Sequence, residues 1–99
     1  MHARVSIFEG SPEQVDGVFD QAREQVLPRG RQLDGFKGVI ALGDRQSGKT
    51  LGITFWENEE ALRASEEAAN SVRSGTAEAS GQQIAGVERY EVGLFEVES

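Results

Sequence analysis

The chain has 99 residues, the length of one domain, and no cysteine, so it can form neither a disulfide framework nor a thiolate metal site. Seventeen acidic residues against ten basic ones give a net charge of −7, which argues against nonspecific binding to nucleic acid or to anionic membranes. The longest apolar run, Gly38–Gly43, is far shorter than the ~20 residues that span a bilayer, and no signal-peptide pattern opens the sequence. We therefore expect one acidic domain over residues 1–99, located in the cytoplasm.

Residues 2–9 predict the first strand, because their side chains alternate between two faces. One face carries Ala3, Val5 and Ile7, and the other carries His2, Arg4, Ser6 and Phe8.

A helix is expected directly after Gly10. Ser11 is the N-cap, Pro12 is the first helical residue and Gln14 completes a capping box. The apolar stripe that follows is Val15, Val18, Phe19, Ala22 and Val26. Pro28 and Gly30 predict the end of this helix.

The middle of the chain predicts a β-hairpin. Strands over about residues 36–42 and over residues 50–56 flank a polar segment that contains Asp44 and Gly48. One face of the later strand carries Leu51, Ile53 and Phe55, and the other carries Thr50, Gly52, Thr54 and Trp56.

Asn58 predicts the N-cap of a second helix. Its buried stripe is narrow and built from small residues: Ala61, Leu62, Ser65, Ala68, Ala69 and Val72. Its glutamates are expected on a solvated face: Glu59, Glu60, Glu66 and Glu67. Residues 73–86 are rich in Ser, Gly and Ala, so we expect a loop with one short helical turn. Residues 87–97 alternate and predict a long last strand.

This order of elements is typical of an α+β fold, the ferredoxin-like βαββαβ arrangement: a four-stranded antiparallel sheet with two helices on one face. We expect Phe8 and Trp56 on the face that the helices leave open. Because a large apolar face is unfavourable in water, the pattern predicts a homodimer in which two sheets close an α+β barrel around a cavity.

Residues 35–62 resemble the antibiotic biosynthesis monooxygenase (ABM) family of dimeric α+β barrel proteins. The segments that carry the likeness are Gly35-Phe36-Lys37-Gly38, Thr54-Phe55-Trp56 and Glu57-Asn58-Glu59-Glu60-Ala61-Leu62. The resemblance implies the barrel fold and a homodimer. It places the chain among cofactor-free quinone-forming monooxygenases, haem-degrading enzymes and small proteins with no known reaction.

The resemblance also separates these branches. The haem-degrading branch uses an asparagine on the first strand, a second tryptophan in the following helix and a later histidine. Here the first-strand positions are Ala3 and Arg4, the helix offers Ala64 and Ser65, and no histidine follows His2. Haem degradation is therefore not expected. The cofactor-free branch has Asn, Trp, Tyr and Arg around its cavity, and Trp56, Tyr90 and either Arg4 or Arg89 supply three of these types.

Five residues are the candidates for lining a ligand cavity: Arg4, Ser6, Thr54, Trp56 and Tyr90. No catalytic residue is assigned, and neither a cofactor nor a metal site is expected. A buried Arg4 needs a carboxylate partner, for which Glu88, Glu91 and Glu96 are candidates, or an anionic ligand. Trp56 either packs between elements or stacks on a planar ligand. His2 is either a frayed, solvated side chain or a cavity-lining acid, base or metal ligand.

The segment Gly43-Asp44-Arg45-Gln46-Ser47-Gly48-Lys49-Thr50 matches the phosphate-binding P-loop pattern. A P-loop needs a helix after it, because the helix N-terminus faces the phosphates. The residues that follow alternate as in a strand, so we expect an ordinary hairpin loop.

Two functions remain open. The first is a cofactor-independent, monooxygenase-like enzyme that acts on a planar oxygenated substrate in the barrel cavity, which the protein desolvates and orients. The alternative is a non-catalytic dimeric barrel that binds a small hydrophobic ligand. An open, partly polar pocket with Trp56 and one charged residue favours the enzyme, whereas a cavity plugged by Phe8, Phe36 and Phe95 favours the alternative.

Overall fold

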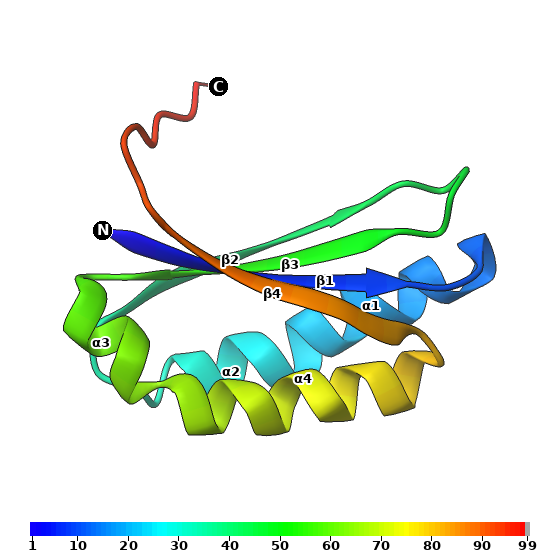
Figure 1. The fold of residues 1–99 in the computed structure, drawn as a ribbon, viewed down its shortest axis with the longest axis horizontal. Coiled ribbons are helices and arrows are strands. Elements are labelled where there is room, and N and C mark those ends of the chain that lie inside the picture. Colours follow the sequence, from blue (N-terminus) through cyan, green and yellow to red (C-terminus); the bar gives the residue numbers. More distant parts are fainter. Residues whose placement is uncertain (99) are drawn as a thin grey trace.

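The structure is a computed structural model that describes residues 1–98. Four strands form the sheet: β1 (His2–Glu9), β2 (Phe36–Gly43), β3 (Thr50–Trp56) and β4 (Gln83–Glu91). Their spatial order is β2-β3-β1-β4, and each pair is antiparallel. The helices all lie on one side of the sheet, and the other side is open (Figure 1). The ferredoxin-like fold expected from the sequence is therefore confirmed.

The first helical segment begins and ends as predicted, but its middle is irregular. A short 3-10 turn, η1 (Pro12–Gln14), leads into α1 (Val15–Gln21), and the Ser11 N–H donates to Gln14 Oε1 at 2.8 Å. The chain then widens into a π-type segment, η2 (Ala22–Val26), before α2 (Leu27–Gly30). Gly30 ends the helix as predicted, but Pro28, the other predicted stop, lies inside it. The proline ring would collide with a carbonyl of a regular helix, and the wider turn before it relieves this clash.

The second helical layer is longer than the sequence suggested. It consists of α3 (Glu59–Ala64), which Asn58 caps by accepting from the Ala61 N–H at 2.8 Å, and α4 (Glu66–Ser80). Most of residues 73–86, expected to be a loop, are therefore helix. The last strand starts earlier than predicted, at Gln83, and ends at Glu91 rather than Val97.

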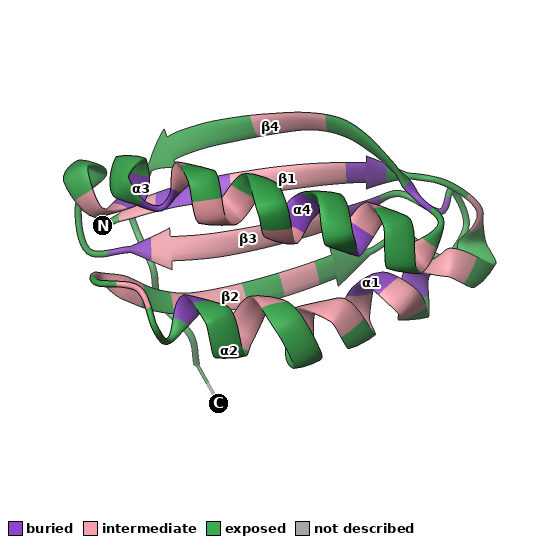
Figure 2. Ribbon diagram, turned by 90° about the horizontal axis from the view of Figure 1, so that it is seen from below, coloured by how far each residue is buried: buried purple, intermediate pink, exposed green. Residues whose placement is uncertain are grey.

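The predicted assignment of the sheet faces is wrong. Phe8 and Trp56 are 3% and 2% exposed and point toward the helices, together with Arg4. The open face carries two apolar rows that run across three strands, Val5–Ile53–Ile40 and Ile7–Leu51–Leu42. Figure 2 shows the helices in front of the covered side, running roughly along the direction of the strands. Alternation groups residues by face correctly, but it does not tell which face the helices cover.

Candidate functional site

A pocket of about 300 Å³ lies between the sheet and the helices. Its floor is formed by the covered faces of β1, β2 and β3, and its walls by α1–α2 and α4. Apolar side chains such as Phe8, Phe36 and Val39 make up much of the lining. The pocket therefore lies inside one protomer, on the helix side of the sheet, and not in the space between two paired sheets where the sequence led us to expect it.

Four of the five candidate residues meet at this pocket. Arg4 and Ser6 line it from β1, and Thr54 and Trp56 line it from β3. The backbone register places Arg4 opposite Thr54, which brings these side chains to one region of the sheet. Tyr90 is absent from the lining among the residues described; it is 53% exposed and its hydroxyl donates to Glu88.

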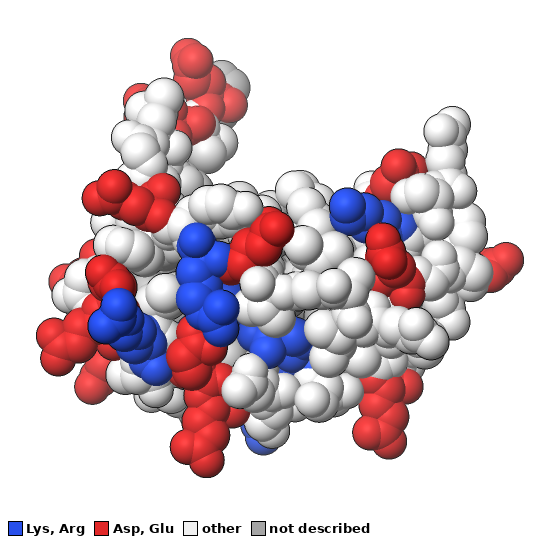
Figure 3. Space-filling view, viewed as in Figure 1, with Lys and Arg blue, Asp and Glu red and all other residues white. Residues whose placement is uncertain are grey.

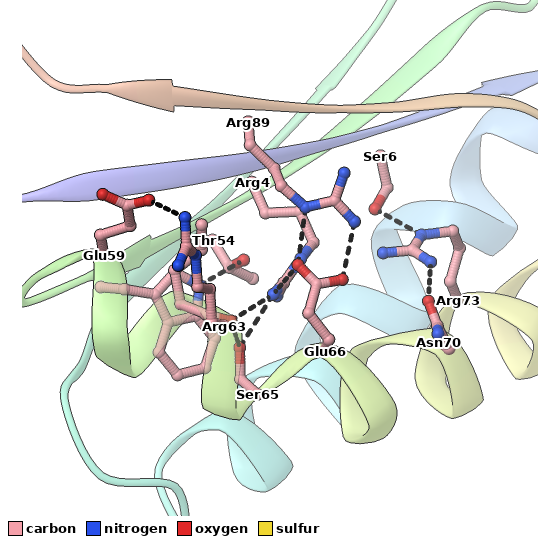
Figure 4. Close-up of polar contacts among 12 residues, drawn as sticks. Arg4, Ser6, Thr54, Glu59, Arg63, Ser65, Glu66, Asn70, Arg73 and Arg89 are labelled. Atoms are coloured by element: carbon pink, nitrogen blue, oxygen red, sulfur yellow. Dashed lines mark hydrogen bonds and ion pairs between the residues drawn. The ribbon is translucent and has the colours of Figure 1, made fainter.

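Arg4 is held on the helix side by three acceptors. Its Nη2 donates to Leu62 O at 2.7 Å, to Ser65 Oγ at 2.9 Å and to Glu66 Oε1 at 2.9 Å (Figure 4). The predicted pairing with a glutamate of the last strand is therefore wrong, because the carboxylate that pairs with Arg4 comes from Glu66 on α4. Glu66, expected on a solvated face, is instead an ion-pair partner with 29% of its side chain exposed.

Glu66 binds a second arginine as well. Arg89 on β4 donates to Oε1 at 2.6 Å and to Oε2 at 2.7 Å. Hydrogen bonds from Arg89 and then from Arg4 lower the pKa of Glu66 to about 2, against the effect of partial burial. The carboxylate is therefore charged over the whole physiological range of pH and is shared between the two guanidinium groups.

Trp56 closes one end of the pocket. Its ring packs edge-on against Phe36, with centroids 5.4 Å apart, and its Nε1 donates to Thr54 Oγ1 at 2.9 Å. The guanidinium carbon of Arg4 lies 5.7 Å from the centre of the ring, within the range of a cation–π contact. The expectation that Trp56 packs between elements is therefore confirmed, whereas its stacking on a planar ligand stays a prediction.

Arg73 lines the same pocket, although the sequence analysis did not identify it as a candidate. It lies on α4, is 8% exposed, and donates from Nε to Ser6 Oγ at 2.9 Å and from Nη1 to Asn70 Oδ1 at 2.7 Å. Burial, and then the positive charge of Arg4, lower the pKa of Arg73. Its spacing could have identified it, because Arg73 follows Ala69 by four residues and so lies on the same buried face of the helix.

The P-loop-like segment is a hairpin loop, as expected, and β3 follows it directly. Gly48 has φ +86°, and a Cβ there would lie 2.1 Å from Gly10 O. Thr50 is fully buried and donates from Oγ1 to Gln82 Oε1 at 2.7 Å. The glycine and the threonine of the pattern thus have structural roles, and the threonine hydroxyl is turned into the protein.

His2 lies within β1 and is half-buried, so the expectation of a frayed, solvated side chain is wrong. Within residues 1–98 no cluster of three His, Cys, Asp or Glu side chains suits a metal ion. Nor does any helix in that range combine the length and the apolar character needed to cross a membrane. The cytoplasmic location stays a prediction.

Sequence comparison finds relatives in Mycobacterium tuberculosis. The uncharacterised protein Rv2558 is 38% identical over 77 residues, which are 78% of this chain and 33% of the relative. The uncharacterised protein Rv2557 is 35% identical over 92 residues, 93% of this chain and 41% of the relative. The chain therefore spans between a third and about two-fifths of the length of the curated relatives it matches. No protein-family model matches it.

Solved structures share the fold over almost the whole chain. A candidate antibiotic biosynthesis monooxygenase from Deinococcus radiodurans has a TM-score of 0.70 at 17% identity and covers 100% of both chains. The monooxygenase of the ActVA-Orf6 gene of Streptomyces coelicolor, in complex with nanaomycin D, has a TM-score of 0.69 at 15% identity, covering 98% of this chain and 92% of that one.

A variant of SnoaB, a cofactor-independent oxygenase of Streptomyces nogalater, has a TM-score of 0.68 at 15% identity and covers 98% and 97% of the two chains. A dimeric ferredoxin-like protein from an uncultured marine organism has a TM-score of 0.62 at 7% identity, with 98% and 92% covered. The ABM-like likeness drawn from residues 35–62 is therefore confirmed at the level of the fold.

Proposed function

We propose that the chain is a cofactor-independent, monooxygenase-like enzyme that acts on a planar oxygenated molecule in the pocket between the sheet and the helices. The observation that carries this proposal is the pocket itself: it is open, largely apolar, walled by Trp56 and contains buried arginine side chains. Phe8 and Phe36 line this space without filling it. The fold shared with SnoaB, itself a cofactor-independent oxygenase, supports the same reading.

The chemistry requires a substrate that reduces oxygen itself. A phenol held as its phenolate can give electrons to O₂ once it is desolvated and oriented. One oxygen atom becomes a new carbonyl oxygen on the ring carbon para to the hydroxyl. The other leaves as water with the hydroxyl hydrogen and the displaced ring hydrogen, and all four electrons come from the substrate. Arg4 and Arg73 favour the phenolate by their positive charge.

The test uses 1,5-dihydroxynaphthalene, which becomes 5-hydroxy-1,4-naphthoquinone by this balance. Purified protein is expected to accelerate both oxygen uptake and quinone absorbance, one O₂ per quinone, above the rate of spontaneous oxidation. Trp56→Phe leaves an aromatic wall but removes the indole, and we expect it to slow the reaction, whereas Arg63→Gln, outside the pocket, serves as the control. A rate equal to spontaneous oxidation would refute the assignment for this class of substrate.

The second candidate is a non-catalytic protein that binds a small hydrophobic ligand in the same pocket. It is favoured by the lack of a histidine or carboxylate in the lining among the residues described, since such groups are the usual general bases. Ligand binding without any oxygen uptake would support this candidate.

We also propose a homodimer joined through the open face of the sheet. Side chains on this face or beside it are unusually exposed for their size: Ile40 (37%), Leu42 (47%), Tyr90 (53%) and Phe95 (47%). The segment after β4 rises on this side, and Phe95 packs edge-on against Phe55 with ring centroids 5.2 Å apart (Figure 1). Fully burying a large apolar side chain gains about 1.5–3 kcal/mol, so covering each of these half-exposed ones gains roughly half as much, and together they favour a second copy of the same face.

Sedimentation equilibrium at low micromolar concentration tests the dimer. We expect twice the monomer mass of 10.8 kDa for the native chain and for Ser74→Asp, which adds a charge to an exposed position of α4. Ile53→Asp adds the same charge at the centre of the open face and is expected to dissociate the dimer. A folded native monomer would contradict this proposal and would leave the pocket untouched.

A further inference from the structure

The pocket is positive although the chain is acidic. Three arginines line it, Arg4 and Arg73 in the interior and Arg29 at an exposed position, and its lining has no acidic residue within residues 1–98. The whole chain, in contrast, carries a net charge of −7. Figure 3 shows basic groups gathered near α3 and the start of α4, with acidic side chains around them.

The buried charges are not balanced. Arg4, Arg73 and Arg89 lie around a single carboxylate, that of Glu66, and only Arg4 and Arg89 form ion pairs with it. Arg73 lies within electrostatic range of both Arg4 and Glu66, since burial and then the charge of Arg4 lower its pKa, whereas the charge of Glu66 raises it. Arg89 is 45% exposed, so solvent screens its charge, whereas the buried Arg4 and Arg73 have only this one carboxylate beside them. One positive charge is therefore left without a partner in a largely apolar pocket. Buried charges of this kind normally have a counter-charge.

Unused donors mark where the counter-charge would lie. Arg4 Nε and Nη1 and Arg73 Nη2 are buried and have no hydrogen-bond partner in the part of the chain that is described, and the same is true of Thr76 Oγ1. Arg4 is 2% exposed, Arg73 8% and Thr76 4%. All three residues line the pocket. Since nearly all buried donors in folded proteins are satisfied, such a cluster calls for an acceptor that arrives with a ligand.

The geometry of two elements explains why these groups meet. Arg4 and Ser6 lie two residues apart on one face of β1, and Arg73 and Thr76 lie one turn apart on one face of α4. Ser6 accepts from Arg73 Nε and so joins the two elements. In Figure 4 the free nitrogen of Arg73 points along α4 toward Glu66 and Arg4.

From these observations we propose that the pocket binds a carboxylate ligand, with the carboxylate held by Arg73, Arg4 and Thr76 and an apolar, planar body lying between Phe8, Phe36 and Trp56. Two oxygens in a plane match the N–H groups of a guanidinium better than a single polar atom does. This proposal makes the proposed function more specific, because the substrate would be a carboxylated aromatic compound. It rests on the proposed function in taking the pocket as the ligand site. The ligand carboxylate then balances the one buried positive charge that Glu66 leaves without a partner.

The experiment compares 2-naphthoate with 2-naphthamide, which has nearly the same shape and no charge. Isothermal titration calorimetry of the native protein at pH 7 is expected to show at least about tenfold tighter binding of the carboxylate. Arg73→Gln should reduce this ratio to about one. Arg63→Gln, which removes the same charge from an exposed position of α3, should leave it unchanged.

Thr76→Val keeps the shape of the side chain and removes only its hydroxyl. It therefore tests the carboxylate site even if the Arg73→Gln variant does not fold. It should weaken 2-naphthoate about threefold to tenfold and leave 2-naphthamide unchanged. Equal affinity for the two probes, no binding of 2-naphthoate below millimolar concentration, or equal losses in Arg73→Gln and Arg63→Gln would each overturn the carboxylate site. A carboxylate preference without oxygen uptake from dihydroxynaphthalene would instead refute the proposed reaction and keep the site.

Discussion

The ion pair between Arg4 and Glu66 gives the sharpest test of how the site is held together. Glu66→Gln keeps an acceptor oxygen for one guanidinium but removes the carboxylate that balances buried Arg4. Breaking a fully buried pair costs about 3–5 kcal/mol. Because 29% of the Glu66 side chain is exposed and Arg4 keeps Leu62 O and Ser65 Oγ, we expect the free energy of unfolding to fall by about 1–3 kcal/mol, or Tm by about 5–15 °C.

Urea unfolding at pH 7, followed by circular dichroism, measures this loss, and Glu67→Gln on the same helix is the matched control at an exposed position. The pKa of Glu66 is about 2 in the folded protein and 4.5 ordinarily, so the folded state binds fewer protons between these values. Its stabilisation is therefore present above about pH 4.5 and is lost as the pH falls toward 2. Equal stability of the two variants at pH 7, or a difference that persists at pH 2, would refute this reasoning.

Three further predictions follow from single features. Gly30→Ala should destabilise the protein by about 1–3 kcal/mol, because the new Cβ would lie 2.5 Å from the ring of Phe36. Gly75→Ala should instead stabilise α4 by about 0.5–1 kcal/mol, because nothing lies within 4 Å of its Cβ position. Urea unfolding of both variants tests this contrast. The fluorescence of Trp56, the only tryptophan, should be blue-shifted from that of a solvated indole, and emission at the solvated wavelength would contradict its 2% exposure. Titration with ATP–Mg²⁺ should give no heat, since the P-loop-like segment leads into a strand; micromolar binding would refute this interpretation.

The elements that local signals define were predictable from the sequence. Strand β3 has the predicted bounds, Thr50–Trp56, because turn residues and a capping asparagine limit it on both sides. The helix starts at Ser11 and Asn58 were also correct, since capping depends on side chains within three residues. Where neighbouring residues decide the structure, the sequence pattern was sufficient.

The second half of α4 could not be predicted in this way, because its stability comes from a distant segment. It contains a run of poor helix formers with small side chains, Ser74-Gly75-Thr76. A Cβ at Gly17 would lie 3.2 Å from Ser80, so α1 and the end of α4 approach very closely. Small residues permit this contact, and the tertiary packing outweighs the weak local propensity.

The candidate site was partly predictable for the same reason. Alternation placed Arg4 with Ser6 and Thr54 with Trp56, and these pairs do share a face. Arg73 depends on the helix that was not predicted, and the partner of Arg4 depends on which face is covered. Both faces are apolar, so neither hydrophobicity nor period could identify the covered one. One consequence was that Glu66 looked like an ordinary solvated glutamate.

The chain has a negative net charge whereas its pocket is positive, so an approaching anion meets different electrostatic forces at long and at short range. At long range the net charge of −7 repels anions, and the lack of a nucleic-acid partner stays a prediction. Inside the pocket, Arg4 and Arg73 act over hydrogen-bond distances in a medium of low polarity, where a single contact outweighs the screened field of distant carboxylates. A small acid with an apolar body gains both that contact and the burial of its ring, whereas a hydrophilic anion gains only the first. We therefore expect the pocket to prefer amphiphilic acids, and we expect this preference to change little with added salt, because Arg4 and Arg73 are shielded from solvent.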